Sequence, residues 1–478
     1  MNKNLKKCIA LIVLLLLVVV TIIMFFTDEN RSGLPSYRLE ILETSFDDNK
    51  TRTDYVDSKG TVTYATDKQF ATIIRTYNDS YVIKEEFFDE NGKPAIQRLG
   101  QYGVSHKYNE LGQRITYEYL DKSGTPMINR DGYYSIYSTY NDKGLLGNDT
   151  YYDINLNQVE NNGGFWQYHR YYNDNNKLGS VLFLDKNGSP TMTNKGYARI
   201  NYEYDESRNA RYEYYFDEGN EHCKSDEGCF GRLIVYDSYG NISSITFLGE
   251  DGSIINVYGY ATVTYTYTNE GYIDVIRYYD ENGNMATGGR GQYGIKNIRG
   301  RHVYLDSQGK ILLRLDNFLN IYPVYILIIG VLLAFIAIHL RKKYKIFFIV
   351  IYMIFILMMT LLYRETTGVH HKQVELLISY RKAVYDVNIL REILENIWLF
   401  VPLGASVYYP PQNITIIGAI FFSVAIEAFQ YVSGLGMCSA DDIISNSIGI
   451  IIGWALATAF HSSSNSSLLD FANRNEVE

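Results

Sequence analysis

Cysteine is scarce in this chain, with four among 478 residues. Only Cys223 and Cys229 lie close together, in the stretch "EHCKSDEGC". In an oxidising compartment this spacing allows one small local disulfide, and two free thiols are the alternative. Cys8 falls too early in the first apolar run to be a lipid-attachment cysteine, and Cys438 stands alone. At most one disulfide is therefore expected.

The sequence also lacks the common signatures of catalysis and cofactor binding. It has no clear Ser–His–Asp set, no zinc-ligand spacing and no phosphate-binding loop. His370 and His371 are adjacent in "TTGVHHKQVE", but two neighbouring histidines with Glu375 form a poor ligand set. We therefore expect no metal and no cofactor, and we favour a non-enzymatic role over an enzymatic one.

Positive charge is in short supply over residues 27–320, where acidic residues outnumber basic ones. The whole chain has a formal net charge of −9. An acidic surface argues against nucleic acid as a partner. It also argues against simple charge attraction to anionic wall polymers or anionic lipids.

Long apolar runs are missing between residues 27 and 320 but stand on both sides of that region. Residues 8–26, "CIALIVLLLLVVVTIIMFF", are long enough to cross a bilayer. Lys3, Lys6 and Lys7 precede the run and are expected to stay in the cytoplasm. A cleaved signal peptide is the alternative, but its run is normally shorter and ends in a small-residue cleavage site. We predict an uncleaved transmembrane anchor over 1–26.

The C-terminal third contains five further apolar segments, at 321–340, 345–363, 394–409, 413–432 and 443–461. With the anchor they predict a multi-pass protein of the cell membrane with six spans, both chain ends in the cytoplasm and 27–320 as a large extracellular region. The segment 394–409 is short and contains Glu395, Asn396 and Pro402, so a re-entrant or buried segment is the alternative there. Residues 462–478 are predicted to be a disordered tail.

Aromatic residues recur through 27–320 at a fixed period of 32 residues. The first series is Tyr55, Phe87, Tyr119, Tyr151, Phe183, Tyr215 and Phe247, and Tyr278 follows one residue early. The second series comes about 21 residues after members of the first and comprises Tyr108, Tyr140, Tyr172, Tyr204 and Tyr236. A fixed period over so many units predicts a repeat array.

Each repeat is expected to form β structure. Stretches such as "ITYEYLD" alternate with period two, and each ends in an Asp-x-x-Gly or Asp-x-Asn-Gly turn signature. We therefore predict β-hairpins of about 32 residues stacked into an elongated solenoid. The turn aspartates are expected to bond to their own backbone, with calcium binding as the less favoured alternative.

The tyrosines of the array are expected to pack in its core and across its strands, with some ring faces left exposed. Exposed aromatic rings suit sugar rings or extended peptides, so cell-wall glycan or peptide is a predicted ligand. A spacer or a platform for a partner protein is the equal alternative. The array resembles the tyrosine- and glycine-punctuated surface repeats of exported bacterial proteins, such as the YD and WG types, and this resemblance implies no function.

Polar residues interrupt the apolar segments near the C-terminus. Glu427 and Gln430 lie three apart on one helical face, and Asp442 and Asn446 lie four apart on the next helix. Such faces on adjacent helices are expected to point at each other, and ionisable groups in membrane segments mark candidate functional sites. A polar clasp between helices and a site for substrate or catalysis both stay open.

Two further expectations concern neighbouring residues. Asp441 is expected to cap the helix that starts near Ile443. Arg391 is a natural partner for one of the carboxylates. The candidate functional cluster comprises Arg391, Asn396, Glu427, Gln430, Asp442 and Asn446.

Three ordered motifs in this region, "ENIWLFVPLG", "SVAIEAFQ" and "ADDIISNSIGIIIG", resemble the VanZ-like membrane protein family. The matching positions are Asn396, Phe400, Pro402, Gly404, Glu427, Gln430, Asp442, Asn446, Gly449 and Gly453. Pro402 is expected to kink or interrupt its helix, and Gly449 and Gly453 to let helices approach closely. The resemblance implies an α-helical transmembrane module over 321–461 and an association with resistance to glycopeptide antibiotics, teicoplanin in particular.

The sequence thus predicts a mixed fold: an N-terminal anchor, an all-β repeat region over 27–320 and a helical membrane module. The favoured function is that of an envelope protein whose module alters antibiotic access or engages a lipid-linked wall precursor, with membrane lipid as a partner. The alternative is a membrane enzyme in which Glu427 or Asp442 acts as general base or acid on a lipid-linked substrate at the outer leaflet. A sensor is less favoured because the cytoplasmic segments are short.

Overall fold

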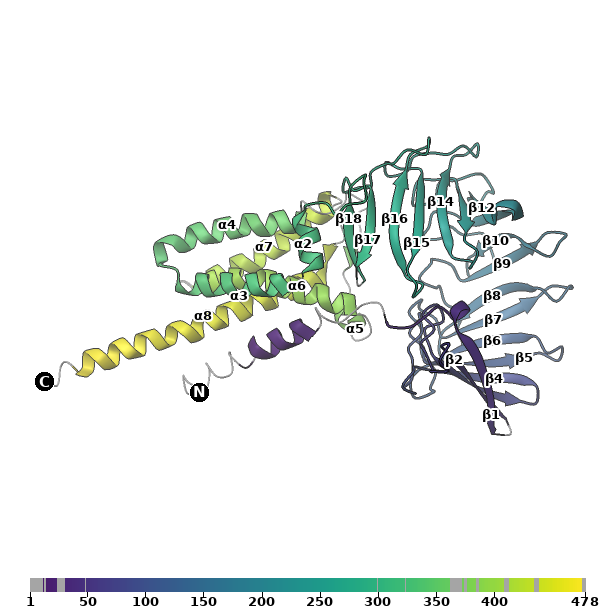
Figure 1. The fold of residues 1–478 in the computed structure, drawn as a ribbon, viewed down its shortest axis with the longest axis horizontal. Helices are drawn as coiled ribbons and strands as arrows, with labels where there is room; N and C mark the ends of the chain where they lie inside the picture. Colours follow the sequence, from purple (N-terminus) through teal and green to yellow (C-terminus); the bar gives the residue numbers. More distant parts are fainter. Residues whose placement is uncertain are drawn as a thin grey trace. The chain divides into compact units, whose positions relative to one another are not determined.

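The computed structural model describes residues 12, 14–23, 31–47, 49–298, 300–322, 324–361, 372–373, 376–383, 387–407, 412–433 and 438–474. The chain forms two compact units, whose strands and helices are labelled in Figure 1. The β-repeat unit comprises Asn30–Gly288 and Tyr293–Asn297. The helical unit comprises Met1–Glu29, Gly289–Gln292 and Ile298–Glu478.

The strands form an 18-stranded antiparallel sheet, as expected from the alternation of apolar and polar residues. From β1 to β17 each strand pairs with the next one in the sequence. The strands are β1 (Glu40–Asp47), β2 (Lys50–Val56), β3 (Thr72–Asn78), β4 (Tyr81–Phe88), β5 (Gly103–Tyr108), β6 (Arg114–Leu120), β7 (Ser135–Tyr140), β8 (Leu146–Tyr152), β9 (Gln167–Tyr172), β10 (Leu178–Leu184), β11 (Arg199–Asp205), β12 (Ala210–Phe216), β13 (Gly231–Tyr236), β14 (Ile242–Leu248), β15 (Thr262–Tyr267), β16 (Ile273–Tyr279), β17 (Gly294–Ile298) and β18 (Arg301–Leu305).

One repeat consists of two paired strands followed by an arm that contains two tight turns. The turn between the paired strands makes a hairpin, and the first turn of the arm folds the chain back on the second strand through an isolated antiparallel bridge, as between Leu120 and Pro126. Backbone bonds also join each arm to the next: the N–H of Asn162 donates to the carbonyl of Asp131, and that of Asn194 to Gly163, both at 2.8 Å. The predicted β repeats are confirmed, and they are linked both through strands and through arms.

The two periodic series of aromatic residues have different tasks. Members of the first series are buried between the sheet and the arms, for example Tyr119, Tyr151 and Tyr215. Members of the second series reach back to the preceding hairpin: the hydroxyls of Tyr108 and Tyr140 donate to the carbonyls of Val82 and Arg114, both at 2.8 Å. Tyr172, Tyr204 and Tyr267 make the same contact in their repeats. The first series therefore fills the core, and the second fastens consecutive repeats.

The turn aspartates bond to their own backbone, as predicted. Asp57 Oδ1 accepts hydrogen bonds from the backbone N–H groups of Lys59 and Thr61, both at 2.9 Å. The side-chain oxygens of Asn109 and Asn141 accept the same pair of bonds at hairpin turns. Asn therefore serves as well as Asp, because a carbonyl oxygen in this position is what the turn requires.

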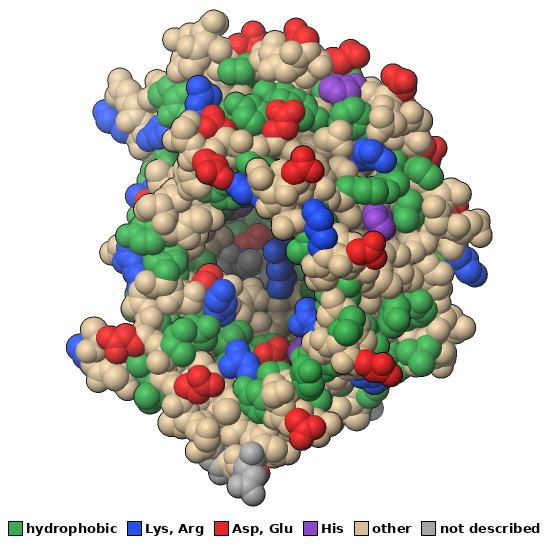
Figure 2. All heavy atoms as spheres, turned by 90° about the vertical axis from the view of Figure 1, so that its right-hand side faces the viewer, with side chains coloured by type: hydrophobic (Ala, Val, Ile, Leu, Met, Phe, Trp, Pro, Cys, Tyr) green, Lys and Arg blue, Asp and Glu red, His purple; other side chains and the backbone are tan. Residues whose placement is uncertain are grey.

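The beginning of the β-repeat unit lies against one of its last hairpins. Thr66 Oγ1 donates to the carbonyl of Glu270 at 2.6 Å, and the Tyr272 hydroxyl donates to the carbonyl of Arg31 at 2.9 Å. The rings of Tyr37 and Tyr239 stack with centroids 4.4 Å apart. The array thus curls back on itself, whereas the sequence predicted an elongated stack. Figure 2 shows this unit hollowed at its middle, with side chains of both charges around the hollow.

The helical unit contains all the labelled helices, strand β18 of the large sheet and two short strands. The helices are α2 (Leu315–Ile321), α3 (Val324–His339), α4 (Lys342–Leu361), α5 (Ile378–Lys382), α6 (Val387–Ser406), α7 (Gln412–Ser433) and α8 (Ala440–Arg474), and the short strands are β19 (Lys372–Gln373) and β20 (Cys438–Ser439). Within the described residues, three stretches are long and apolar enough to cross a membrane: Lys343–Leu361, Thr415–Ser433 and Ala440–Phe460. The pair α2 and α3, bent by 108°, makes a fourth if it counts as one span.

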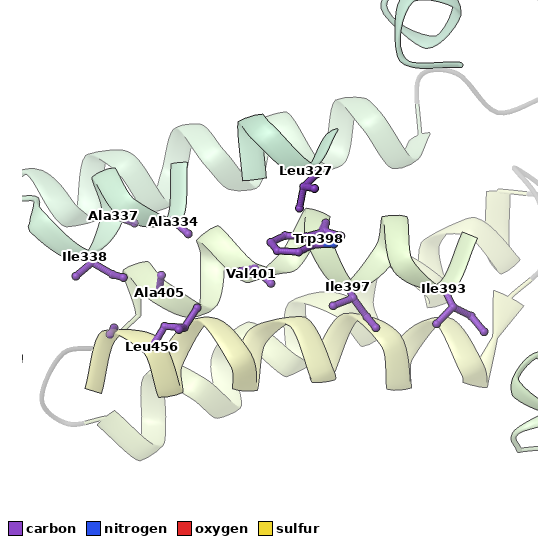
Figure 3. Packing of buried hydrophobic residues seen from close by; sticks show 11 residues of the cluster. Leu327, Ala334, Ala337, Ile338, Ile393, Ile397, Trp398, Val401, Ala405 and Leu456 are labelled. Atoms are coloured by element: carbon purple, nitrogen blue, oxygen red, sulfur yellow. The ribbon is translucent and has the colours of Figure 1, made fainter. Parts of the chain in front are cut away.

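Helix α6 is the centre of the helical unit. One buried cluster joins it to α3 and α8 and includes Leu327, Trp398, Val401 and Leu456 (Figure 3). A second cluster, on another side of α6, joins Phe400 and Leu403 to α4 and α7. A helix that is buried on several sides agrees with the buried alternative for this segment, although α6 begins earlier than the predicted 394–409.

Two sequence expectations about the helices need correction. Pro402 lies inside α6 and does not interrupt it, because the helix continues to Ser406, while the kink that proline favours at this point stays a prediction. The predicted disordered tail is helical as far as Arg474, since "HSSSNSSLLDFANR" contains no glycine or proline that would stop α8. Residues 475–478 of that prediction lie outside the described residues.

Candidate functional site

The predicted polar cluster lies where α6, α7 and α8 meet. Asn396 Nδ2 on α6 donates to Asp442 Oδ1 on α8 at 3.0 Å. This bond joins two helices that run side by side in the same direction, since Ile397 lies against Gly449 and Val401 against Gly453 further along. The sequence placed both residues in the cluster, and the structure brings them into direct contact.

Glu427 makes a different connection. It is buried on α7, and its Oε2 accepts a hydrogen bond from the backbone N–H of Ser439 at 3.0 Å. Ser439 belongs to β20, which pairs in parallel with β19. Glu427 therefore holds the segment that leads into α8, and a carboxylate suits this position because it accepts from backbone N–H groups more strongly than a neutral group does.

The two amides of the cluster each donate one bond across helices. Gln430 Nε2 donates to the carbonyl of Thr360 on α4 at 3.2 Å, and Asn446 Nδ2 donates to Ser423 Oγ on α7 at 2.9 Å. Both side chains are buried, and Gln430 is 0% exposed. Within the part of the chain that the structure describes, Gln430 Oε1 and Asn446 Oδ1 accept no hydrogen bond.

Asp441 does not cap α8, contrary to the sequence expectation. It lies inside the first turn of α8, and its two carboxylate oxygens accept the backbone N–H groups of Leu377 and Ser379, both at 2.6 Å. It therefore caps α5, which is separated from it by about sixty residues of chain. The Tyr380 hydroxyl and Ser445 Oγ, 2.8 Å apart, add a second link between α5 and α8.

Arg391 is buried on α6, one helical turn before Glu395. The electrostatic partner of Glu395 is Arg391 together with Arg301 from β18. Burial lowers the pKa of Arg301, and the Glu395 carboxylate opposes this effect. Arg391 thus interacts electrostatically with Glu395 on the same helix, and its pairing with a carboxylate of the cluster stays a prediction.

Residues 345–461 match the family model described as VanZ/LLP1. This part of the chain is a VanZ-like domain, as the ordered motifs predicted. The match takes in every residue of the polar cluster and all of α6, α7 and the apolar part of α8.

Other comparisons add little to this assignment. No curated protein matches the chain. Among solved structures, a Tc holotoxin pore from Photorhabdus luminescens is 13% identical with a TM-score of 0.24, and the match covers 55% of this chain and 13% of that chain. A porin-like protein from Bacteroides uniformis is 16% identical with a TM-score of 0.20, and the match covers 58% of this chain and 95% of that chain.

The glycines of the VanZ-like domain let α6 and α8 touch through their backbones. A Cβ at Gly404 would lie 2.0 Å from the carbonyl oxygen of Ile450, and one at Gly453 would lie 2.0 Å from that of Val401. At Gly449 the corresponding distance, to the oxygen of Ile397, is 2.3 Å. Any side chain at these positions would force the two helices apart.

The N-terminal helix, Leu14–Ile23, packs on the VanZ-like domain. Trp398 Nε1, fully buried on α6, donates to Thr21 Oγ1 at 2.8 Å. Leu14, Leu17 and Val18 pack against the cluster shown in Figure 3. The helix therefore contributes to the bundle, while the membrane anchor over 1–26 stays a prediction.

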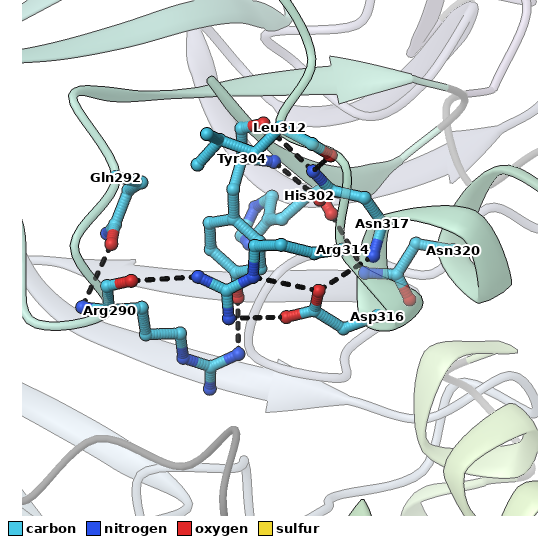
Figure 4. A network of polar contacts seen from close by, with 9 residues as sticks. All are labelled: Arg290, Gln292, His302, Tyr304, Leu312, Arg314, Asp316, Asn317 and Asn320. Carbon is cyan, nitrogen blue, oxygen red and sulfur yellow. Dashed lines mark hydrogen bonds and ion pairs between the residues drawn. The ribbon is translucent and has the colours of Figure 1, made fainter. Parts of the chain in front are cut away.

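A polar junction connects β18 to α2 within the helical unit (Figure 4). The buried side chain of Asn317 donates to the carbonyls of Tyr304 and Leu312 and accepts from the N–H of Tyr304 at 2.8 Å. Arg314 pairs with Asp316 at 2.7 Å. Sequence reasoning missed this junction, because Asn and Arg next to an apolar segment are also typical of an exposed membrane boundary.

Several partners of the cluster were also missed. Ser423, Ser439 and Thr360 give the cluster one hydroxyl, one N–H and one carbonyl, and none of these groups carries a signal in the sequence.

In the β-repeat unit, Cys223 and Cys229 are free thiols and not the disulfide that their spacing allowed. The Cys223 thiol donates to the carbonyl of Gly196, while Cys229 contacts Ser225, so each sulfur has a neighbour of its own.

Among the described residues, no group of three or more His, Cys, Asp or Glu side chains could hold a metal ion. Of the carboxylates in the cluster, Asp442 accepts from an amide and Glu427 from a backbone N–H. This arrangement can hold helices α6, α7 and α8 in one register, and it leaves two buried amide oxygens without a donor among the described residues.

Proposed function

We propose that this chain is a multi-pass membrane protein of the bacterial cell envelope that acts without catalysis. In this proposal the VanZ-like domain lies in the membrane, the β-repeat unit lies outside the cell, and residues 1–26 anchor the chain. The VanZ-like domain alters the access of a glycopeptide antibiotic or engages a lipid-linked wall precursor, and the β-repeat unit binds wall material.

The observation that carries this proposal is the way in which the carboxylates of the cluster are used. Asp442 is bonded to Asn396 and Glu427 to the N–H of Ser439, so both are occupied in joining chain segments. A general base must reach the proton that it removes. Carboxylates that are already engaged in this way support a fixed polar clasp that shapes a binding surface.

A membrane enzyme is the second candidate, and one observation favours it. The buried oxygens of Gln430 and Asn446 accept no bond from any residue that the structure describes. A buried acceptor without a donor is costly, so a hydroxyl or amide of a bound substrate would be a suitable partner. Glu427, one turn from Gln430 on α7, would then be the acid or base toward a lipid-linked substrate.

Antibiotic susceptibility tests the proposal. The full chain and its Glu427→Gln and Glu427→Asp variants are expressed in a susceptible Gram-positive host and titrated with teicoplanin and with vancomycin. We expect the full chain to raise the inhibitory concentration of teicoplanin more than that of vancomycin. Glu427→Gln should reduce this effect only partly, because an amide oxygen still accepts the bond from Ser439.

Glu392→Gln, at an exposed position of α6, is the matched control and should behave as the unchanged chain does. Membrane insertion and amounts of each variant are compared by detergent extraction. Complete loss in Glu427→Gln at normal amounts would favour the enzyme. No selective shift with any variant would refute a role in teicoplanin resistance.

A further inference from the structure

One repeat of the β-repeat unit departs from its neighbours at two core positions. The first position lies two residues before the first strand of a repeat. It is occupied by an aromatic residue in three nearby repeats, as Phe165, Tyr197 and Tyr260. In the repeat built from β13 and β14 the equivalent residue is Cys229, which is 0% exposed. A thiol therefore stands in the place of a ring in this repeat.

The second departure is the second residue of the same strand. Val104, Ile136, Ile200 and Val263 stand there in other repeats, and Ile200 and Val263 belong to the same buried cluster as Cys229. In β13 this residue is Arg232, opposite Phe247 on β14. Its guanidinium forms an ion pair with Glu227 of the arm. Arg232 Nε is buried and has no hydrogen-bond partner among the residues that the structure describes.

The following arm completes the site. Val257 and Tyr260 exchange two backbone hydrogen bonds, which closes a two-residue turn in which Tyr258 and Gly259 both have left-handed φ values, 61° and 89°. A tyrosine is unfavourable in this region of backbone space, and such strain tends to be kept at functional sites. The ring of Tyr258 is 53% exposed at the edge of the site.

The second departure, Arg232, lines a cavity of about 220 Å³ together with Tyr258 of the following arm. Its walls include the rings of Tyr258, Tyr260, Tyr265 and Tyr278, and its polar groups are Arg232 and Glu227. Drug-sized ligands occupy sites of about 300–1,000 Å³, so this cavity suits a smaller group, such as one six-membered ring.

We propose that this cavity binds one pyranose ring of a neutral glycan. The inference rests on the proposed function, because it names the class of wall material that the β-repeat unit takes. Tyrosine faces match the C–H faces of a sugar ring, and a hydroxyl both donates and accepts, so it can bond to Glu227 and Arg232 together. The Arg232 charge is already balanced by Glu227, so a neutral ligand fits better than an anion.

The test uses the full chain in detergent, titrated by calorimetry with the trimer of N-acetylglucosamine. Arg232→Ile restores the common aliphatic residue, and Tyr258→Ala removes an exposed ring from the cavity wall. The first change follows the pattern of the array and the second alters an exposed side chain, so the protein should fold, which circular dichroism checks. We expect each to weaken binding by about tenfold or more. Tyr137→Ala removes an exposed ring in another repeat and should leave binding unchanged.

Absence of binding by the unchanged chain, or equal binding by Arg232→Ile and Tyr258→Ala, would overturn the proposal. Sedimentation with insoluble cell-wall sacculi separates this result from the broader function. Retention on sacculi without trimer binding would overturn the sugar site and leave wall binding intact. Failure of both would overturn the sugar site and wall binding together.

Discussion

Leu156 occupies a turn position that is glycine in neighbouring repeats. Gly124 and Gly188 have φ values of 77° and 82° at the equivalent place, and Leu156 adopts 63°. Its backbone N–H donates to the carbonyl of Asp153 at 3.0 Å, so the turn closes as the others do. The fold thus imposes on a leucine a conformation that its side chain disfavours.

We expect Leu156→Gly to stabilise the β-repeat unit by about 0.5–1 kcal/mol. The left-handed conformation costs a leucine about 1–2 kcal/mol, while glycine loses about 0.5–1 kcal/mol more on folding through backbone entropy. Leu156 is 65% exposed, so little packing is lost. Chemical unfolding followed by tyrosine fluorescence measures the change. Gly188→Leu is the reverse control and should destabilise the unit; a shift of the same sign in both variants would contradict the explanation.

The turn aspartates make the stability of the β-repeat unit depend on pH. The backbone N–H of Thr61 is the main cause that holds the pKa of Asp57 below its ordinary value of 3.8, and the Thr125 hydroxyl does the same for Asp121. Because the folded pKa is the lower one, the folded state binds fewer protons. The stabilisation is therefore complete above pH 3.8 and is lost as the pH falls through the folded pKa.

The melting temperature of the β-repeat unit should therefore fall as the pH is lowered from about 4 to about 2. Asp121→Asn and Asp153→Asn, made together, should reduce this dependence, because Asn109 and Asn141 already hold equivalent turns with an amide oxygen. Differential scanning fluorimetry across this range measures both proteins. An unchanged pH slope in the double variant would show that other groups cause the acid destabilisation.

Helices α6 and α8 form the closest contact in the VanZ-like domain. Gly404 and Gly453 allow backbone to touch backbone, and Asn396, halfway along α6, bonds to Asp442 in the first turn of α8. The small residues let the two helices approach closely, and the polar pair fixes their register. Both features are typical of helices that associate in membranes. A clasp of this kind depends on the two features together.

Gly453→Ala should destabilise the VanZ-like domain by about 3 kcal/mol, at the upper end of what overpacking costs, because the new methyl group would meet the Val401 carbonyl. Thermal inactivation in detergent, followed by fluorescence-detected size exclusion, measures the loss. Gly418→Ala on α7 is the matched control, since a Cβ there meets no atom within 4 Å. Equal melting temperatures of the two variants would show that the contact between α6 and α8 does not determine the thermal stability of the domain.

Closure of the β-repeat unit is a property of the whole array. Contacts of Thr66 with Glu270 and of Tyr272 with Arg31 join residues more than two hundred positions apart. Tyr272→Phe removes one of these bonds, so we expect a loss of about 1 kcal/mol and faster proteolysis near residue 31. Tyr137→Phe, on a strand far from the closure, is the control. Equal proteolysis rates in both variants would mean that the closure does not protect the beginning of the unit.

The sequence predicted the parts of the molecule that repeat and missed the parts that occur once. Asp57 and its equivalents, the buried Tyr119 series and the ordered VanZ-like motifs all carry local or periodic signals. The cap that Asp441 gives to α5, the Trp398–Thr21 bond and the closure by Thr66 depend on single contacts between distant segments. Such pairs come together only when the chain folds, so neither the repeat period nor the spacing of residues in the sequence predicts them.

The backward reach of the second tyrosine series bears on how this gene can change. Tyr108, Tyr140 and Tyr172 each fasten a hairpin to the one before it, so a duplicated unit would find its usual neighbours wherever it was inserted. The bond between Thr66 and Glu270 can form only in an array with this number of repeats, because it joins the beginning of the array to one of its last hairpins. A gain or loss of one repeat would therefore keep the contacts between neighbouring repeats and disrupt the contacts that close the array, so only the closing contacts would have to be replaced.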